Sequence, residues 1–217
     1  MQRSIAVLAF ALVTAVHLVS QLLGHRQIAD LTQVLLMPLL ALVLLRATRA
    51  PRSREVRLVL VALGFSWLGD TLPRLADGDA ALLTMIGCFL LAQLVYAAAF
   101  WPSRHRSVLG RPLALLPYLL AGATIVGLSA REAGALLPAV AVYALAILAM
   151  AVLATGRGRV AAIGAAVFVL SDALIALDAF GVLTLPAHAV WVMATYVAAQ
   201  VLLVLGVLAG ERAAAGS

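Results

Sequence analysis

Eight apolar runs, separated by short polar segments, constrain this chain more than any other feature of its sequence. A membrane-spanning helix needs about 20 mostly apolar residues, and runs close to that length take up most of the 217 residues. We expect the spans at residues 4–24, 28–45, 56–72, 80–101, 113–129, 133–154, 160–180 and 187–209. The predicted fold class is therefore all-α, a polytopic membrane helix bundle of about eight transmembrane helices. The short loops leave no room for a soluble domain, so residues 1–217 are expected to form one integral membrane domain.

Composition supports this fold class and excludes others. Hydrophobic residues make up 65% of the chain and charged residues 11%, whereas a soluble domain carries about 25% charged residues. The net charge of +6 does not indicate a nucleic-acid partner, because the arginines lie in short segments between apolar runs. The single cysteine, Cys88, excludes an internal disulfide and a cysteine-based metal site. Zinc-ligand spacing, a P-loop and a Gly-x-Ser-x-Gly motif are also missing from the sequence, so no cofactor and no metal are expected.

The arginines also predict the orientation of the chain. With the N-terminus inside, twelve of the fifteen arginines fall on the cytoplasmic side, and only Arg26, Arg74 and Arg131 fall outside. An excess of basic residues in the loops marks the cytoplasmic side of a membrane protein. We therefore expect a multi-pass protein of the cell membrane with both termini in the cytoplasm.

Two aspartates inside the apolar runs are the main functional candidates. Asp70 and Asp172 each lie in a Leu-small-Asp-small-Leu pentapeptide, 13 residues beyond Arg57 and Arg159 respectively. At about 1.5 Å per residue, both carboxyls are expected about 20 Å from the inner interface, in the outer half of the membrane. An ionisable group at such depth costs roughly 2.5–3.5 kcal/mol, so each calls for a reason.

Two readings of these aspartates follow from the residues alone. A lone membrane aspartate can cap a broken helix or bond to a neighbouring hydroxyl. Two carboxyls that face each other in a medium of low dielectric constant are instead not expected to ionise together, which leaves one protonated acid beside one carboxylate. The matched depth and the similar pentapeptides favour the second reading, an acid/base pair.

A weaker internal similarity predicts that the bundle consists of two parallel four-helix repeats. Ala-Gln-Leu at 92–94 in the fourth span corresponds to Ala-Gln-Val at 199–201 in the eighth. Repeats of this kind place a shared site at their interface. Arg74 could pair with Asp70, hold a lipid phosphate or reach the interface. Four further side chains could line a polar cavity or pack within the bundle: Gln93, Tyr96, Tyr196 and Gln200.

The remaining polar residues are explained by solvent exposure, by a place at the membrane interface or by packing. Asp178, Asp77 and Asp79 lie near the outer ends of spans or in loops, where solvent covers them, and His188 is expected at the interface. His17, inside the first span, is more typical of a hydrogen-bonded packing residue.

At these motifs the sequence resembles the YhhN-type lysoplasmalogenase family of eight-span membrane proteins. The likeness rests on Gly-Phe-Ser-Trp-Leu-Gly-Asp at 64–70, on the segment 168–180 around the second aspartate, and on Tyr-Val-Ala-Ala-Gln-Val-Leu at 196–202. The length and the number of spans also agree. The sequence departs from the family where members often carry a histidine, at Gln93, and a lysine, at Thr32-Gln33, which bears on substrate range.

The resemblance implies hydrolysis of the vinyl ether of a lysoplasmalogen to a fatty aldehyde and a glycerophospho-base. A vinyl ether is cleaved by protonating its β-carbon, and water then captures the oxocarbenium ion. This needs an acid and a carboxylate, as in glycosidases, and the hypothesis gives these roles to Asp70 and Asp172 in an order that the sequence leaves open. The substrate would be a lipid that enters from the bilayer.

Two other functions remain open at this point. Paired membrane carboxylates and parallel repeats are also typical of small proton-coupled transporters. A structural or assembly subunit without chemistry is the third reading.

Overall fold

The computed structural model describes residues 2–215 and is 87% helical. Its eight long α-helices are α1 (Gln2–Leu22), α2 (Arg26–Ala47), α3 (Arg54–Thr71), α4 (Gly78–Phe100), α5 (Pro112–Ser129), α6 (Leu137–Thr155), α7 (Arg159–Ala179) and α8 (His188–Ala215). Four short 3₁₀ helices are η1 (Leu72–Leu75), η2 (Trp101–Arg106), η3 (Val108–Gly110) and η4 (Gly134–Leu136). Within the described residues all eight long helices are long and apolar enough to cross a membrane. The prediction of an all-α polytopic bundle is confirmed.

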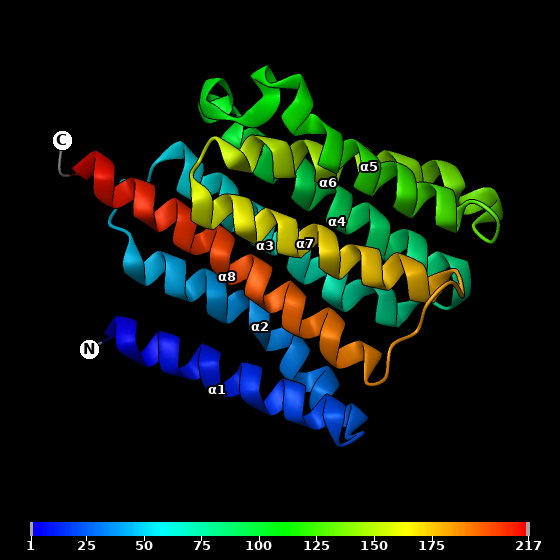
Figure 1. The fold of residues 1–217 in the computed structure, drawn as a ribbon. Coiled ribbons are helices and arrows are strands. Elements are labelled where there is room, and N and C mark those ends of the chain that lie inside the picture. Colours follow the sequence, from blue (N-terminus) through cyan, green and yellow to red (C-terminus); the bar gives the residue numbers. More distant parts are fainter. Residues whose placement is uncertain (1, 216–217) are drawn as a thin grey trace.

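The described chain begins and ends at the same end of the bundle, which we call the terminal end (Figure 1). The loops that follow α2, α4 and α6 lie there too, and the loops that follow α1, α3, α5 and α7 lie at the opposite, distal end. Arg26, Arg74 and Arg131 belong to the distal end, and the other arginines of the described helices and loops belong to the terminal end. Which end faces the cytoplasm stays a prediction from this distribution.

Local sequence explains where several helices begin. Ser53 precedes α3, and its side chain accepts a hydrogen bond of 3.2 Å from the backbone N–H of Val56. Such a cap supplies one of the partners that the first turn of a helix lacks. Pro112 and Pro138 lie in the first turns of α5 and α6, where the missing N–H of proline removes no intrahelical bond.

A proline inside α2 creates a contact between helices. Pro38 has no N–H, so the carbonyl of Val34, four residues earlier, loses its intrahelical donor. The indole N–H of Trp67 on α3 donates to this carbonyl at 2.9 Å. Because no water is available in a bilayer to replace a missing donor, this bond joins α2 and α3 one turn before Asp70.

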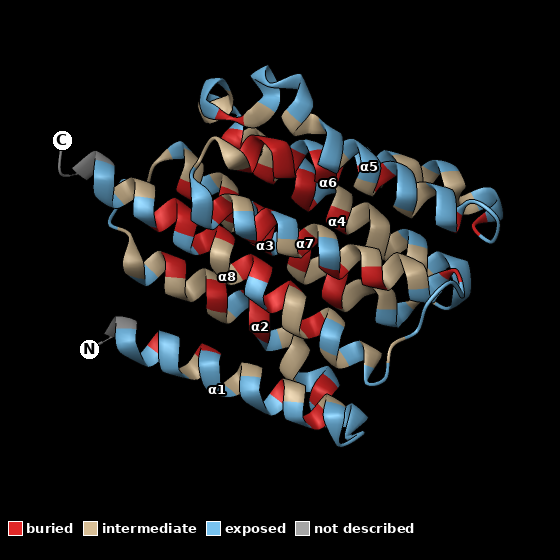
Figure 2. Ribbon diagram, viewed as in Figure 1, coloured by how far each residue is buried: buried red, intermediate tan, exposed pale blue. Residues whose placement is uncertain are grey.

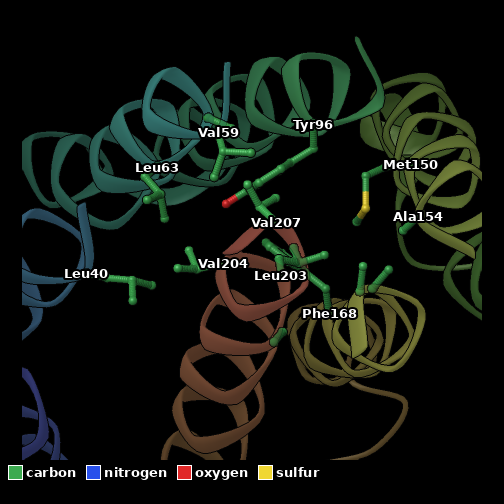
Figure 3. Close-up of a cluster of buried hydrophobic side chains, with 14 of the residues drawn as sticks. Leu40, Val59, Leu63, Tyr96, Met150, Ala154, Phe168, Leu203, Val204 and Val207 are labelled. Carbon is green, nitrogen blue, oxygen red and sulfur yellow. The ribbon is translucent and has the colours of Figure 1, made fainter. Parts of the chain in front are cut away.

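The buried core gathers around α8 (Figure 2). In the most apolar stretch of α8, 56% of the residues are buried, against 17% in α1 and 11% in α5, which lie at the edges of the bundle. Figure 3 shows side chains of α2, α3, α4, α6 and α7 meeting Leu203, Val204 and Val207 of α8 in one cluster. This packing fixes α3 and α7, which carry the two candidate aspartates, on either side of α8.

Large apolar side chains cover the outside of the bundle. Exposed examples include Leu8, Leu12, Leu119 and Leu145, each at least 60% exposed. A surface of this kind on long helices is suited to lipid chains rather than to water. Eight apolar helices with this surface describe a multi-pass membrane protein.

Candidate active site

Asp70 and Asp172 line the same cavity, which has a volume of about 380 Å³. Asp70 lies in the last turn of α3 and Asp172 in the distal half of α7, so the two helices bring them to the cavity from two sides of α8. The walls also include residues of α1, α2, α4 and α8 and the short helix η1. The two carboxyls thus line one cavity, as expected for a shared site, and their chemical roles stay a prediction.

Both oxygens of Asp70 accept hydrogen bonds. The phenol of Tyr196 on α8 donates to Oδ2 at 2.8 Å, and the amide of Gln33 on α2 donates to Oδ1 at 3.5 Å. Asp70 is only 8% exposed. Because an ionised carboxylate only accepts hydrogen bonds, the two donors offset part of the cost of burying a charge on Asp70.

Asp172 has a different environment. The phenol of Tyr143 on α6 donates to Oδ2, and this phenol accepts in turn from the amide of Gln93 at 3.4 Å. Among the described residues, Oδ1 of Asp172 has no hydrogen-bond partner. One oxygen of Asp172 is therefore open to carry a proton.

The small residues beside each aspartate explain how the helices approach one another. A side chain at Gly69 would begin 2.7 Å from ring atoms of Phe89, so only glycine lets this ring of α4 lie against α3. Ser171 is fully buried and donates to the carbonyl of Val192 on α8 at 3.0 Å. The shared pentapeptide thus packs α3 on α4 and α7 on α8, which orients the two carboxyls.

An aromatic cluster supports the floor of the cavity. Phe89, Phe168 and Tyr196 meet edge to face, with ring centroids 5.7 to 6.4 Å apart. These contacts hold the phenol of Tyr196 where it donates to Asp70.

Arg74 lies at the distal mouth of the same cavity. Its guanidinium donates to the side-chain oxygen of Gln33 at 2.6 Å and to the backbone carbonyl of Asp30 at 2.8 Å. It also lies 3.6 Å from the carboxylate of Asp30. Arg74 therefore reaches Asp70 through Gln33 and does not pair with it directly.

Two narrow apolar cavities adjoin the large one at Asp172. One, of about 50 Å³, lies between α4, α6 and α7, and the other, of about 40 Å³, lies between α5, α6 and α7. Both are lined by apolar side chains apart from Tyr143 and Asp172. Asp172 thus lies where a cavity with several polar side chains meets two cavities that are almost entirely apolar.

A comparison with protein-family models shows to which family the chain is related. The model described as the YhhN family matches residues 28–207. This chain belongs to the YhhN family. No curated protein and no solved structure matches it.

Three of the expected lining residues of this YhhN protein lie deeper than the cavity. Tyr96 donates to Gln200 at 2.6 Å, and Gln200 donates to Ser66 at 3.0 Å. Gln93 bonds to Tyr143. Gln93, Tyr96 and Gln200 are fully buried and do not line the cavity, whereas Arg74 and Tyr196 do. Substrate contact stays a prediction for all five.

Sequence reasoning missed Tyr143, and it noted Gln33 only as a departure from the YhhN pattern. Both bond directly to the aspartates. Tyr143 lies in the sixth span without a charged neighbour, so nothing in the sequence connects it with Asp172, 29 residues later. His188, expected at the interface, and Gln21 also line the cavity.

Proposed function

We propose that this YhhN protein is a membrane hydrolase that cleaves the vinyl ether of lysoplasmalogen-like lipids. The products are a fatty aldehyde and a glycerophospho-base. The observation that carries the proposal is the position of Asp172, where a cavity with several polar side chains, among them a second carboxyl, Asp70, meets two narrow apolar cavities. Such a site suits a single-chain amphiphile whose reacting bond lies between its headgroup and its alkyl chain.

The hydrogen bonds favour different roles for the two aspartates. Asp70 accepts from Tyr196 and Gln33 through both oxygens, which supports the carboxylate form. Asp172 has one oxygen free and apolar surroundings on two sides, which supports the protonated form. We assign the general acid to Asp172 and the general base to Asp70.

The reaction then proceeds through an oxocarbenium ion and a hemiacetal. Asp172 gives its proton to the β-carbon of the vinyl ether, and the α-carbon and ether oxygen share the resulting positive charge. The carboxylate of Asp70 stabilises this cation and takes a proton from water as the water adds to the α-carbon, which forms a hemiacetal. Asp70 returns its proton to the ether oxygen while Asp172 regains one from the hemiacetal hydroxyl. The C–O bond breaks, and aldehyde and alcohol leave with both residues restored.

The substrate is expected to enter from the bilayer, since the bundle exposes apolar helices and the reacting groups lie within it. Its headgroup would lie at the distal end with Arg74, and the carbons next to its ether would lie in the narrow apolar cavities beside Asp172, which have room for only a short part of the alkyl chain. By the distribution of arginines the distal end faces away from the cytoplasm, with both termini cytoplasmic in the cell membrane. Tyr196 and Tyr143 act as positioning residues, because each orients a carboxyl.

Aldehyde release from a lysoplasmalogen by purified protein in detergent tests the proposal. The wild type is compared with Asp70→Asn and Asp172→Asn, and with Asp77→Asn as a matched control at an exposed position of the distal end. We expect release by the wild type and the control, and a loss of at least about 100-fold in kcat in each of the other two variants. Full turnover in either Asp70→Asn or Asp172→Asn would refute the assigned chemistry.

A folded wild type that releases no aldehyde would refute the vinyl ether substrate. Counterflow of an unchanged solute in proteoliposomes would then favour the transporter. If both aspartates proved replaceable and a partner protein co-purified, the structural subunit would be favoured.

A further inference from the structure

A wider apolar cavity, of about 270 Å³, lies between α5 and α6, and we call it the α5–α6 cavity. It shares no lining residue with the cavity of the two aspartates. Its walls come from both helices and from η2 and η3 at the terminal end. Along α6 the wall extends from Leu145 to Leu153, about 12 Å at 1.5 Å per residue. A space of this length and lining suits part of an acyl chain that runs from the terminal end toward the middle of the membrane.

The helix on one side of the α5–α6 cavity has few partners within the protein. In the most apolar stretch of α5 only 11% of the residues are buried, the smallest share among the eight long helices of the described chain. A further cavity, of about 330 Å³, lies between α5, α6 and α7. Leu119 on α5 and Leu145 on α6 line the α5–α6 cavity and are nevertheless exposed. Because an apolar wall without partner atoms loses dispersion contacts, a chain from outside the protein would stabilise this packing.

The terminal mouth of the α5–α6 cavity carries a positive charge that no nearby acid balances. Residues 101–111, which contain η2 and η3, include Arg104, Arg106 and Arg111 and no acidic residue (Figure 1). From residue 101 to residue 158 the only acidic residue is Glu132, at the distal end. Among the residues that the structure describes, none of these three arginines forms an ion pair. Their charge is therefore available to an anion.

Arg104 connects this charge with the apolar wall. Its guanidinium carbon lies 4.9 Å from the ring centroid of Trp101, and Trp101 lines the cavity. Stacking on an aromatic ring orients the guanidinium plane and leaves N–H groups at its edge that can bind phosphate oxygens. Other arginines of the terminal end are engaged within the protein, since Arg52 donates to a backbone carbonyl and Arg157 pairs with Glu55. Arg104 thus differs from them in its place beside an apolar cavity.

We propose that the α5–α6 cavity and Arg104 bind one anionic phospholipid from the leaflet at the terminal end. One acyl chain lies between α5 and α6, and the phosphate accepts hydrogen bonds from Arg104. Basic pockets between membrane helices bind anionic headgroups in this way. A zwitterionic headgroup fits less well, because its ammonium group would enter the same positive mouth. The site is separate from the two aspartates, so this inference does not depend on the proposed hydrolysis.

Lipid binding by the purified protein in a neutral detergent tests the proposal. The probes are phosphatidylglycerol and phosphatidylcholine with the same two acyl chains, and native mass spectrometry gives the Kd of the first bound molecule of each. One arginine near a membrane surface favours an anionic lipid by about fivefold, so we expect phosphatidylglycerol to bind at least about 10-fold tighter. Equal binding of the two lipids would overturn the proposal. Millimolar inorganic phosphate should not displace the lipid, and displacement would assign the site to a free phosphate instead.

Two variants assign the headgroup and the chain to residues. Arg104→Gln should lower the preference for phosphatidylglycerol about fivefold. Ala149→Phe fills the α5–α6 cavity from α6 without changing any charge, and it should abolish the tight binding of phosphatidylglycerol. Circular dichroism and size-exclusion chromatography compare the fold of each variant with the wild type. An unchanged preference in Arg104→Gln, or unchanged tight binding in Ala149→Phe, would refute the site.

Matched controls make the same changes away from the α5–α6 cavity. Arg49→Gln removes a charge from an exposed position of the same end, in the loop after α2. Ala123→Phe adds a ring at an exposed position of α5 that does not line the cavity. Both should bind the two lipids like the wild type. Equal losses in the controls and in the test variants would show a general effect of charge or bulk and would overturn the proposal.

A second copy of the chain is the competing occupant of this cavity. Light scattering after size-exclusion chromatography gives the oligomeric state of the wild type and of Ala149→Phe with and without phosphatidylglycerol. We expect the same oligomeric state in all four samples. A dimer that Ala149→Phe separates and that lipid does not affect would assign the cavity to a contact between two chains.

Discussion

The bond from Trp67 to the carbonyl of Val34 gives the sharpest test of the packing. Trp67→Phe keeps an aromatic ring but removes the one side-chain donor that reaches this carbonyl among the residues that the structure describes. The carbonyl is then left unsatisfied, which costs about 1–3 kcal/mol in general, although bonds between membrane helices average about 0.6 and reach about 1.7 kcal/mol. We expect a loss of about 1–2 kcal/mol, since Pro38 removes the alternative donor within α2.

A double-mutant cycle isolates this bond from the packing of the indole. Pro38→Ala restores an N–H that can donate to Val34 within α2, so in that background Trp67→Phe should lose only its packing term. Unfolding in mixed micelles with increasing sodium dodecyl sulfate, followed by circular dichroism at 222 nm, gives the loss of unfolding free energy caused by Trp67→Phe in each background. Trp101→Phe, at an exposed indole, is the matched control. An equal cost of Trp67→Phe in both backgrounds would show that the bond does not stabilise the fold.

Two further predictions concern a hydroxyl group and a glycine. Tyr196→Phe removes the donor to Asp70 and should lower kcat about 10-fold with little change in KM. Tyr118→Phe is the control and should retain full activity, because the hydroxyl of Tyr118 has no hydrogen bond among the described residues. Equal kcat values for the two variants would exclude a positioning role for Tyr196. Gly164→Ala should destabilise the bundle by about 1–3 kcal/mol, because its Cβ would begin 2.9 Å from backbone of α8. Gly127→Ala, with open space around it, should be neutral or stabilising, and the same unfolding assay would contradict this reasoning if the two variants behaved alike.

The helices were predictable because each apolar run has the length and the composition that a helix needs to cross a bilayer. Every expected span overlaps one helix of the structure, with ends that differ by a few residues. The largest difference concerns α8, which continues to Ala215, six residues beyond the expected end. Arg212 lies in this last part and does not end the helix, because a helix that leaves the bilayer can continue in water with charged side chains.

The aspartates were also predictable, since an acidic residue in an apolar run stands out at any position. Their partners were not. Tyr143 and Gln33 are ordinary residues of helices, and only the packing of α6 on α7 and of α2 on α3 brings them to Asp172 and Asp70. The distances in sequence, 29 and 37 residues, carry no pattern that a single sequence would reveal.

The predicted equivalence of the two halves ends at these partners. The aspartates occupy similar pentapeptides, but Asp70 takes its donors from α2 and α8 and Asp172 takes its donor from α6. Whether the halves are repeats stays a prediction. The surroundings matter more for the chemistry, because two carboxyls in identical settings would compete for one proton without preference. Donors on both oxygens of Asp70 and apolar walls beside Asp172 remove that symmetry. The two similar motifs would thus supply the two carboxyls, and the different neighbours of each carboxyl would make one the acid and the other the base.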